Sequence, residues 1–313
     1  MIDPVSLRAL IALHDEGTVA AAAESLGYTG SNVTQHLRKL ERHYAVPMVE
    51  RAGRRVVLTP AAIALVQRAR PIVDDLEQLV RAPLGEREPQ GTLRVGAFPT
   101  AIRGLMVPVL ARAASQYPRL KIVPIEVEQA EALEMLAQGS LDAVVHKSWG
   151  RIPPDEFRQR VLTRVELGND ALDAVVPAFH PLAENESIAL RELATDQWAL
   201  SPIHDPYSRW IASHDPALLA PLAQAFEAAE FQTLIRYVEA GIAVTVVPRL
   251  GRGILPSTVR AVPLRDEDAF RIVHLYARPI AAASTTMRAL AELLRKALRS
   301  EEQVEGLPPI SVL

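Results

Sequence analysis

The sequence predicts a multidomain protein in which a small all-α N-terminal domain precedes a larger α/β domain of two lobes. Three observations predict this fold class. Apolar residues at helical spacing crowd the first 58 residues, one long helical pattern follows, and strand-like and helical segments alternate from about residue 92. Such alternation predicts a parallel sheet covered by helices. With 313 residues, the chain has room for two or three units that each bury a core.

The composition is that of an ordinary globular protein, with 49% hydrophobic and 23% charged residues. The sequence contains no cysteine, which excludes thiol nucleophiles, iron–sulfur clusters, cysteine zinc sites and disulfides. Its first residues carry an acid rather than a basic run, so we expect no signal peptide. No apolar stretch approaches the length of a membrane helix, which is about 18 residues or more. We therefore expect a cytoplasmic protein that has no membrane partner.

Charge is distributed unevenly along the chain, although the net charge is only −3. Residues 28–60 carry six basic side chains against two acidic ones, and the remainder is acidic overall. A local excess of positive charge suits a surface that contacts phosphate groups. A solvated face on a small domain is the alternative explanation for so few charges.

Three helices are predicted in the N-terminal domain. The first is indicated by apolar residues at helical spacing, namely Val5, Leu7, Leu10, Ile11 and Leu13. Thr18 can cap a second helix, and Gly27 makes the turn that follows it. Thr29 or Ser31 can cap a third helix that runs to about Tyr44 and has one apolar side. Two short helices therefore meet across a glycine turn, an arrangement that also occurs in generic three-helix cores.

A basic turn at residues 51–55 lies between two short apolar runs, residues 47–49 and 56–58. This pattern predicts a two-stranded wing beside the helices. Thr59 and Pro60 then begin a long helix, because threonine caps helices and proline is tolerated at the first helical position.

The long helix carries an apolar seam at spacings of 4, 3, 4 and 3 residues, formed by Leu65, Ala69, Ile72, Leu76 and Leu79. Such a seam predicts a short coiled coil, so we expect this helix to pair with a second copy of the chain. Pro71 removes one backbone hydrogen bond and predicts a kink. An amphipathic helix packed against its own chain is the alternative.

A linker rich in proline and glycine follows the long helix, and the α/β pattern begins after it. The last strand and helix are expected to return to the first lobe. The expected N-terminal part consists of a helical head with a wing at 1–59, a dimerisation helix at 60–83 and a hinge at 84–91. The α/β domain is expected at 92–303, with lobe 1 at about 92–164 and 268–303 and lobe 2 at about 165–267. A loose tail is expected at 304–313.

Three segments of the head, residues 17–26, 31–41 and 47–59, resemble the winged helix-turn-helix domain of LysR-type transcriptional regulators. The order of head, long helix, linker and two-lobed domain is similar to that family over nearly the whole chain. The resemblance implies a regulator, not an enzyme, that binds double-stranded DNA at a dyad operator as a homodimer or homotetramer. It implies RNA polymerase as a partner if the protein activates transcription. It also implies that the α/β domain is periplasmic-binding-protein-like and holds a small-molecule effector, of unknown identity, between its lobes.

In that family the third helix reads bases in the major groove, and the resemblance assigns this role to Gly30, Ser31, Asn32 and Gln35. Asparagine and glutamine can each form two hydrogen bonds with adenine. Gly30 stands where the family usually has glutamine, so one base-reading side chain is missing. Phosphate contacts are assigned to Thr29, Thr34 and Arg38 and to the wing arginines Arg51, Arg54 and Arg55.

Effector contacts are expected where strands end, because ligands of open α/β sheets bind beyond the carboxyl ends of strands. The resemblance places these residues there: Phe98, Pro99, Thr100, Glu128, Gln129, His146, Lys147, Ser201, Ile203, His204, Phe231 and Thr233. His146 and Lys147 favour an acidic effector and Glu128 opposes one, so the sign of the effector's charge stays open. A helix cap at Thr100 and ordinary structural histidines are the alternatives.

Sequence motifs of enzymes are absent, among them a Walker loop, a dinucleotide fingerprint, His-Glu-x-x-His and Gly-x-Ser-x-Gly. The eight histidines are scattered without metal-ligand spacing. We therefore expect no catalytic residue, no cofactor and no bound metal. The alternative function is a cytoplasmic two-lobed small-molecule-binding protein or enzyme whose N-terminal helices serve only as an oligomerisation module.

Overall fold

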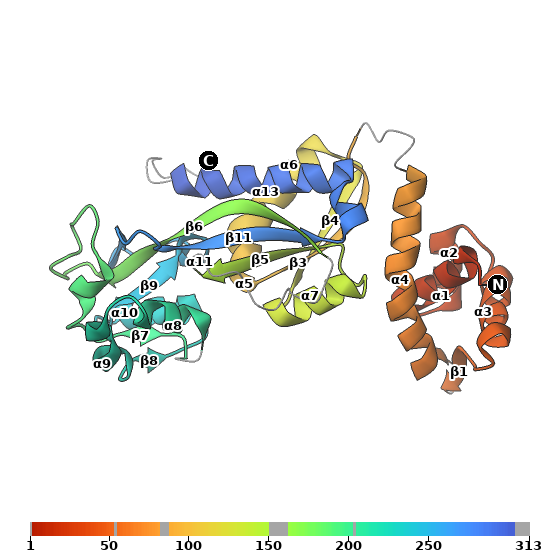
Figure 1. The fold of residues 1–313 in the computed structure, drawn as a ribbon, viewed down its shortest axis with the longest axis horizontal. Helices are drawn as coiled ribbons and strands as arrows, with labels where there is room; N and C mark the ends of the chain where they lie inside the picture. The colour runs from red at the N-terminus through yellow and green to blue at the C-terminus, as the bar shows by residue number, and fades with distance from the viewer. Residues whose placement is uncertain (1, 53–54, 82–87, 150–161, 203–204, 304–313) are drawn as a thin grey trace.

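The computed structural model describes residues 2–52, 55–81, 88–149, 162–202 and 205–303. These residues form a helical head, a long helix α4 (Pro60–Arg81) beside it, and a larger α/β domain that continues to the C-terminal helix (Figure 1). No helix within the described ranges is long and apolar enough to cross a membrane.

Each helix of the head begins at a residue whose side-chain oxygen accepts an amide hydrogen bond from the first turn. Asp3, Thr18 and Thr29 do this for α1 (Pro4–Glu16), α2 (Val19–Leu26) and α3 (Gly30–Tyr44). Helix α2 ends at Gly27, whose backbone is left-handed with φ +66. The apolar sides of the three helices meet in one core that includes Leu10, Leu13, Val33, Leu37 and Leu40.

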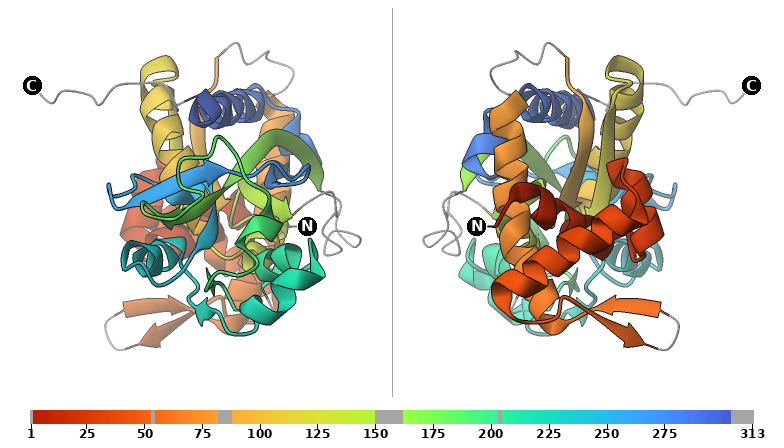
Figure 2. Two further views of the ribbon diagram at one scale, coloured as in Figure 1. Left: turned by 90° about the vertical axis from the view of Figure 1, so that its left-hand side faces the viewer. Right: turned by 90° about the vertical axis from the view of Figure 1, so that its right-hand side faces the viewer.

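The wing is an antiparallel pair, β1 (Val49–Ala52) and β2 (Arg55–Leu58), that projects from the helices (Figure 2). Two hydrogen bonds fix its base. Glu41 Oε1 on α3 accepts the amide of Met48 at 2.9 Å, and Thr59 Oγ1 donates to the carbonyl of Pro47 at 2.8 Å. The wing therefore has a set position relative to α3.

Helix α4 carries two adjacent apolar stripes with the same spacing. Ala62, Val66, Ala69 and Val73 are buried against the chain itself. Ile72 is 64% exposed and Leu76 is also exposed, Leu65 is half-buried, and the side chain of Leu79 lies outside the described part of the chain. Ala69, expected to face a partner, thus packs within its own chain. Spacing alone does not distinguish the two stripes, since each fits a helix period.

Ion pairs hold α4 to both neighbouring domains. Buried Arg70 donates through Nη1 to Asp15 Oδ2 of α1 at 2.8 Å. On the other domain, Arg278 Nη2 donates to Asp74 Oδ2 at 3.1 Å. Burial raises the pKa of Asp74 to about 6, with Arg278 opposing that rise. Helix α4 is therefore a shared element of the head and the larger domain.

Seven of the described strands form one sheet in the order β10-β6-β11-β5-β3-β4, with β9 paired to β6. Strand β3 is parallel to β4 and β5, whereas β11 is antiparallel to β5 and β6. Within this sheet, parallel pairing is thus present only among β4, β3 and β5, because β11 returns from the second lobe between two strands that lead there. The bounds are β3 (Gly91–Ala97), β4 (Leu120–Glu126), β5 (Ala143–Trp149), β6 (Thr163–Pro177), β9 (Thr245–Pro248), β10 (Val259–Pro263) and β11 (Phe270–Ala277).

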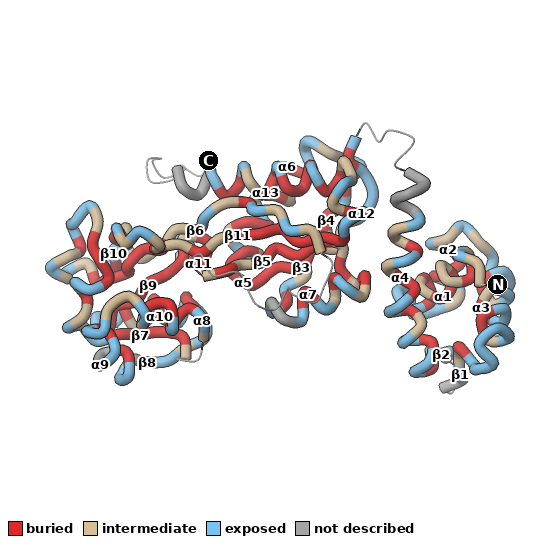
Figure 3. The backbone as a smooth tube through the Cα atoms, in the orientation of Figure 1, coloured by how far each residue is buried: buried red, intermediate tan, exposed pale blue. Residues whose placement is uncertain are grey.

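Helices cover both faces of the sheet in the first lobe. Helices α6 (Val107–Gln116) and α13 (Thr285–Gln303) pack on one face, and α7 (Gln129–Ala137) packs on the other. Strands β5 and β11 at the middle of the sheet are mostly buried, whereas β4 and the first part of β6 are only partly so (Figure 3). The remaining short segments of this lobe are α5 (Pro99–Ala101), the π-helical turn η2 (Ile102–Met106) and α12 (Pro279–Ala282).

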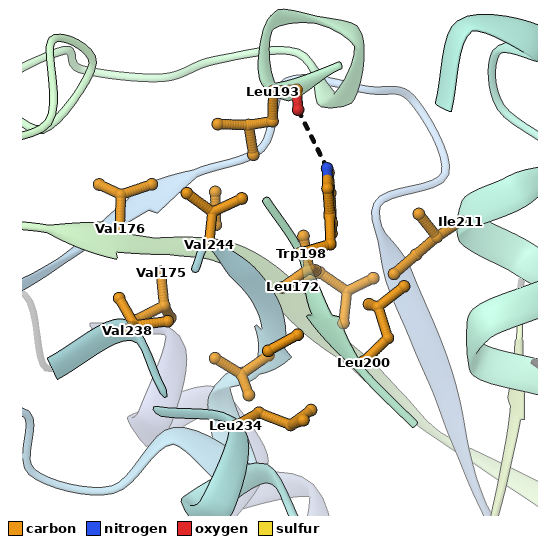
Figure 4. Packing of buried hydrophobic residues seen from close by; sticks show 14 of the residues in the cluster. Leu172, Val175, Val176, Leu193, Trp198, Leu200, Ile211, Leu234, Val238 and Val244 are labelled. Carbon is orange, nitrogen blue, oxygen red and sulfur yellow. Dashed lines mark hydrogen bonds between the residues drawn. The ribbon is translucent and has the colours of Figure 1, made fainter. Parts of the chain in front are cut away.

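The second lobe has a separate apolar core around Trp198 (Figure 4). The indole Nε1 donates to the carbonyl of Leu193 at 3.0 Å, which satisfies the one polar atom of a wholly buried side chain. Strand β6 joins this core to the first lobe, because its first part pairs with β11 and its end pairs with β9 and β10. The other elements of the lobe are η4 (Leu190–Leu193), β7 (Ala199–Leu200), α8 (Pro206–Ala212), η5 (Pro216–Leu218), α9 (Leu219–Leu222), β8 (Phe226–Glu227), α10 (Phe231–Glu239) and α11 (Arg249–Arg252).

Two glycines of the head form a matched pair for a stability test. A Cβ at Gly27 would meet nothing within 4 Å, and one at Gly30 would meet only Val19 at 3.7 Å, so both sites have room for a methyl group. They differ in backbone, because Gly27 is left-handed and Gly30 begins α3 without a positive φ. Gly30→Ala should stabilise the head by about 0.5–1 kcal/mol, since alanine has less freedom in the unfolded chain. Gly27→Ala should destabilise it by about 1 kcal/mol.

Hydrogen–deuterium exchange of the α2 and α3 amides in the full chain measures both effects locally. Exchange should slow in Gly30→Ala and accelerate in Gly27→Ala. Shifts in the same direction for both variants would contradict the role given to the left-handed turn.

Candidate functional site

The first half of α3 presents a polar face to solvent. Ser31, Asn32, Gln35 and Arg38 are all exposed, while Val33 on the opposite side is buried in the core of the head. An open groove runs along this face and the chain after the helix, lined by Val19, Gly30, Ser31, Thr34, Gln35, Arg38, Glu41, Arg42, Ala45, Val46 and Pro47. Short polar side chains on a rigid, capped helix suit contact with base edges in a major groove.

Two of the threonines assigned to phosphate contacts already bond to the helix. Thr29 Oγ1 accepts the amide of Asn32 at 3.3 Å and lies 2.8 Å from Ser31 Oγ. Thr34 Oγ1 donates to the carbonyl of Gly30 at 2.8 Å. These hydroxyls shape the start of α3. The Thr34 hydroxyl hydrogen is already donated, whereas either hydroxyl of the Thr29–Ser31 pair can be the donor.

Two neighbouring cations on α3 differ in their surroundings. Lys39 forms an ion pair with Asp3, the residue that caps α1, and the hydrogen bond from Lys39 together with the amide of Ser6 lowers the pKa of Asp3 to about 2. Arg38 is exposed, and the described residues offer its side chain no ion pair. Arg38 is thus a cation of this helix whose charge is available to a phosphate.

Two of the three wing arginines, Arg51 and Arg55, lie in the β1–β2 hairpin. Arg51 is in β1 and Arg55 begins β2, one step apart in register. Their side chains and the whole of Arg54 lie outside what the structure describes.

A second group of predicted residues meets where the two lobes join. Strands β3 and β5 end there and β11 begins there. Lys147 Nζ lies 4.8 Å from the centroid of the Phe98 ring, and the Arg271 guanidinium carbon also lies 4.8 Å from that centroid. Two cations therefore share one aromatic ring.

Arg271 is the centre of this junction and is wholly buried. Its Nε donates to Asp170 Oδ2 at 2.7 Å, and its Nη2 donates to Thr100 Oγ1 at 2.6 Å. Asp170 Oδ1 also accepts the amide of Leu250 at 3.0 Å. One buried ion pair thereby ties together β11, β6, α5 and α11.

Aromatic rings carry the contact from the first lobe to the second. The ring of Trp149, at the end of β5, lies 5.1 Å from that of Tyr207 and 6.2 Å from that of Trp210 on α8. Tyr207 in turn lies 5.4 Å from Phe231, the first residue of α10. The predicted residue Phe231 thus reaches the junction through Tyr207.

His146 does not join this group, although it was expected to. Side chains alternate between the faces of a strand, so Lys147 faces the junction and His146 faces the α7 side of the sheet. There it is buried, opposite His274 in register and 5.5 Å from the Tyr276 ring. Burial and then the neighbouring His274 lower the pKa of His146 to about 3, so this imidazole is neutral.

The remaining predicted residues occupy varied positions. Ser201 is buried and its carbonyl accepts from Ser208 Oγ, Pro99 is half-buried, and Glu128 and Thr233 are exposed. Ile203, His204 and the side chain of Gln129 lie outside the described residues. The structure does not bring Glu128 or Thr233 into contact with Arg271.

Arg271, Asp170, Trp149 and Tyr207 were missed by the sequence interpretation. A usable signal existed for Arg271, because it is a lone charge within an apolar strand, where a buried partner is required. Among the described residues, no group of three or more histidine, aspartate or glutamate side chains is arranged to hold a metal ion.

Comparison with known proteins gives two family matches. The family described as LysR substrate binding domain matches residues 86–299, and the family described as bacterial regulatory helix-turn-helix protein, lysR family, matches residues 5–63. The two matches cover the larger domain and the head respectively.

Curated relatives are similar over most of the chain. A probable hydrogen peroxide-inducible genes activator of Mycobacterium avium is 26% identical over 303 residues, which cover 95% of each chain. The HTH-type transcriptional regulator TtuA of Agrobacterium vitis is 28% identical over 282 residues, 88% of this chain and 89% of the relative. GbpR of Rhizobium radiobacter is 32% identical over 200 residues, which span only 63% of this chain and 64% of that regulator.

Solved structures share the fold. A full-length OxyR variant from Pseudomonas aeruginosa has a TM-score of 0.73 at 21% identity, covering 94% of this chain and 98% of that chain. Full-length BenM has a TM-score of 0.54 at 23% identity, covering 96% of this chain and 98% of that chain. The predicted fold class, a helical winged head followed by a two-lobed α/β domain, is confirmed.

The buried His146 predicts a pH dependence of stability. Its pKa is about 3 in the folded chain and near 6.5 when exposed, so the unfolded chain binds more protons below pH 6.5. The free energy of unfolding should therefore fall as the pH drops from about 6.5 toward 3, by up to about 1.4 kcal/mol per pH unit for this one group.

Thermal unfolding of the full chain between pH 7 and pH 5 measures that loss. His146→Gln should reduce it, and His43→Gln, which removes an exposed histidine from α3, should leave it unchanged. Equal losses in the wild type and in His146→Gln would refute the assignment.

Proposed function

Because the chain belongs to the LysR family of bacterial regulatory proteins, we propose that two copies of its head bind a dyad operator through α3 and the wing. The family that the motifs of the head predicted is confirmed. The chain is a LysR-type transcriptional regulator with an effector-binding domain. The dyad, the base contacts and the effector site are our proposals.

The observation that carries the DNA proposal is the exposed polar face of α3. Asn32 and Gln35 stand free of the core on a helix capped by Thr29, and Arg38 supplies an available charge one turn later. Fixed positions for base-reading and phosphate-binding side chains are what direct readout requires.

The effector is proposed to act at the junction of the lobes. Side chains from α5, β5, β6, β11 and α8 meet there, so a ligand that favours one arrangement of the lobes would shift their equilibrium. The junction is proposed to bind its ligand rather than convert it, in keeping with relatives that are named regulators.

Hydrogen peroxide appears in the name of one relative, but the sequence here has no cysteine whose thiol could be oxidised. We infer that the effector of this chain binds without a covalent change.

Selection of sheared genomic DNA by the full-length protein, at two salt concentrations, tests the proposed function. Enrichment of a few sites with an imperfect dyad supports a sequence-specific dimer or tetramer, and genes beside those sites indicate whether RNA polymerase is engaged. Retention of all fragments alike, or of none, would instead favour a head that serves as an oligomerisation module.

Arg38 and Lys39 provide a matched test of the docking. Arg38→Ala should weaken binding to all sequences and reduce the salt slope of the affinity by about one unit, because one phosphate contact is lost. Lys39→Ala also removes one positive charge, but Asp3 already offsets that charge, so this variant should lose less affinity for DNA. Fluorescence anisotropy with an operator and a scrambled duplex measures both, and a larger loss for Lys39→Ala would contradict the proposed face.

Asn32→Ala should instead reduce the ratio of operator to scrambled affinity, by about 1–3 kcal/mol of discrimination, while binding to scrambled DNA persists. An unchanged ratio would show that Asn32 does not read a base.

The exposed stripe of α4 is the proposed dimer contact. Ile72→Asp should weaken association, because Ile72 is 64% exposed on the predicted seam. Ile63→Asp is the control, since Ile63 is 39% exposed and lies about two and a half turns before Ile72, on the opposite side of the same helix. Sedimentation velocity over a range of concentrations compares them, and equal effects would indicate a different interface.

A further inference from the structure

The guanidinium of Arg271 is only partly satisfied. Its Nε and Nη2 donate to Asp170 and Thr100, but Nη1 is buried and has no hydrogen-bond partner among the residues that the structure describes. A guanidinium group stays protonated in proteins, so the unpaired N–H cannot be removed by deprotonation. Buried charged donors in native proteins almost always have an acceptor. Nη1 is therefore a position at which a ligand could supply the missing acceptor.

Lys147 adds a second positive charge beside the same ring. Burial, followed by the nearby Arg271, lowers the pKa of Lys147 to about 8, while Asp205, Glu128 and Asp170 oppose that effect. At neutral pH most copies of this side chain remain charged. Two cations therefore lie around Phe98, each 4.8 Å from its centroid.

Three aspartates near the junction already accept hydrogen bonds from other groups. Asp170 bonds to Arg271 Nε and to the Leu250 amide. Asp173 accepts from Arg249 at 3.0 Å and from Arg252 at 2.5 Å. Asp205 caps α8 by accepting the Tyr207 amide at 2.8 Å. None of these groups supplies an acceptor to Arg271 Nη1.

The surroundings of that donor are aromatic. Its guanidinium lies over Phe98 and 5.8 Å from the centroid of Trp149, which itself stacks with rings of the second lobe. A ligand that reached Nη1 would place its remaining atoms against flat apolar surfaces contributed by both lobes.

We propose that the effector is a small carboxylate whose acid group accepts a hydrogen bond from Arg271 Nη1 and pairs with Lys147, with its apolar part against Phe98 and Trp149. This inference rests on the proposed effector function of the junction. It assigns the charge of the effector that the sequence left open. His146 lies on the other face of the sheet, and the two cations Lys147 and Arg271 face one exposed carboxylate, Glu128.

The test uses the full-length protein and two matched pairs of compounds, acetate with acetamide and phenylacetate with phenylacetamide, at constant ionic strength. Each acid, at concentrations up to about 0.1 M, should raise the thermal midpoint in proportion to its occupancy, and the isosteric amides should not. Phenylacetate should act at a lower concentration than acetate. Equal shifts for acids and amides, or no shift with either acid, would overturn the proposal.

A variant then locates the effect. Lys147→Met should abolish most of the acid-dependent shift, while Lys121→Met, which removes an exposed cation from β4 of the same lobe, should retain it. An undiminished shift in Lys147→Met would place the anion elsewhere and refute the assigned site.

The DNA selection experiment keeps this inference separable from the proposed function. A chain that selects dyad sites but ignores carboxylates keeps its regulatory function and loses only the assigned ligand class. A chain that binds carboxylates at Lys147 but selects no DNA keeps the ligand class and loses the proposed function.

Discussion

The buried pair of Arg271 and Asp170 is the interaction on which the larger domain depends. Removing two ions from water is costly, and the attraction between them offsets that cost only when further hydrogen bonds complete the geometry. Thr100 and the Leu250 amide provide those bonds, so the pair orders four elements that are distant in sequence. The same network leaves Nη1 of Arg271 without an acceptor among the described residues, and this is the atom at which we propose that a carboxylate binds.

A second set of ion pairs connects the domains. Arg70 binds Asp15 in the head, and Arg278 binds Asp74 on the same helix. Gly139 approaches so closely that a Cβ there would lie 2.9 Å from the Pro71 nitrogen. Since proline has no amide hydrogen, the turn after α7 can lie directly against α4 at this residue. The proline that sequence analysis associates with a kink is thus part of an interdomain contact.

Local features were predictable from sequence, and features that depend on the fold were not. Thr18, Thr29 and Thr59 mark helix starts by accepting a hydrogen bond from the amide three residues later, and the structure has helices there. The burial of Ala69 depends on which side of α4 packs against the rest of the chain. The direction of the His146 side chain depends on which face of β5 meets the second lobe. Arg271 acts through Asp170, 101 positions earlier, and no local pattern links the two. The fold class was accessible, whereas the centre of the effector junction was not.

The length of α4 gives small movements of the larger domain a large effect at the head. The larger domain contacts α4 at Asp74, and the helix begins beside the wing at Pro60. These residues are fourteen positions apart, which corresponds to about 21 Å along the helix axis. A rotation of about 9° around Asp74 would move the far end by about 3.4 Å, the rise of one base pair along one DNA strand. In a symmetric dimer the displacements of the two heads add. A modest twist between the lobes would therefore change the spacing of the two α3 helices enough to favour a different separation of the half-sites in DNA.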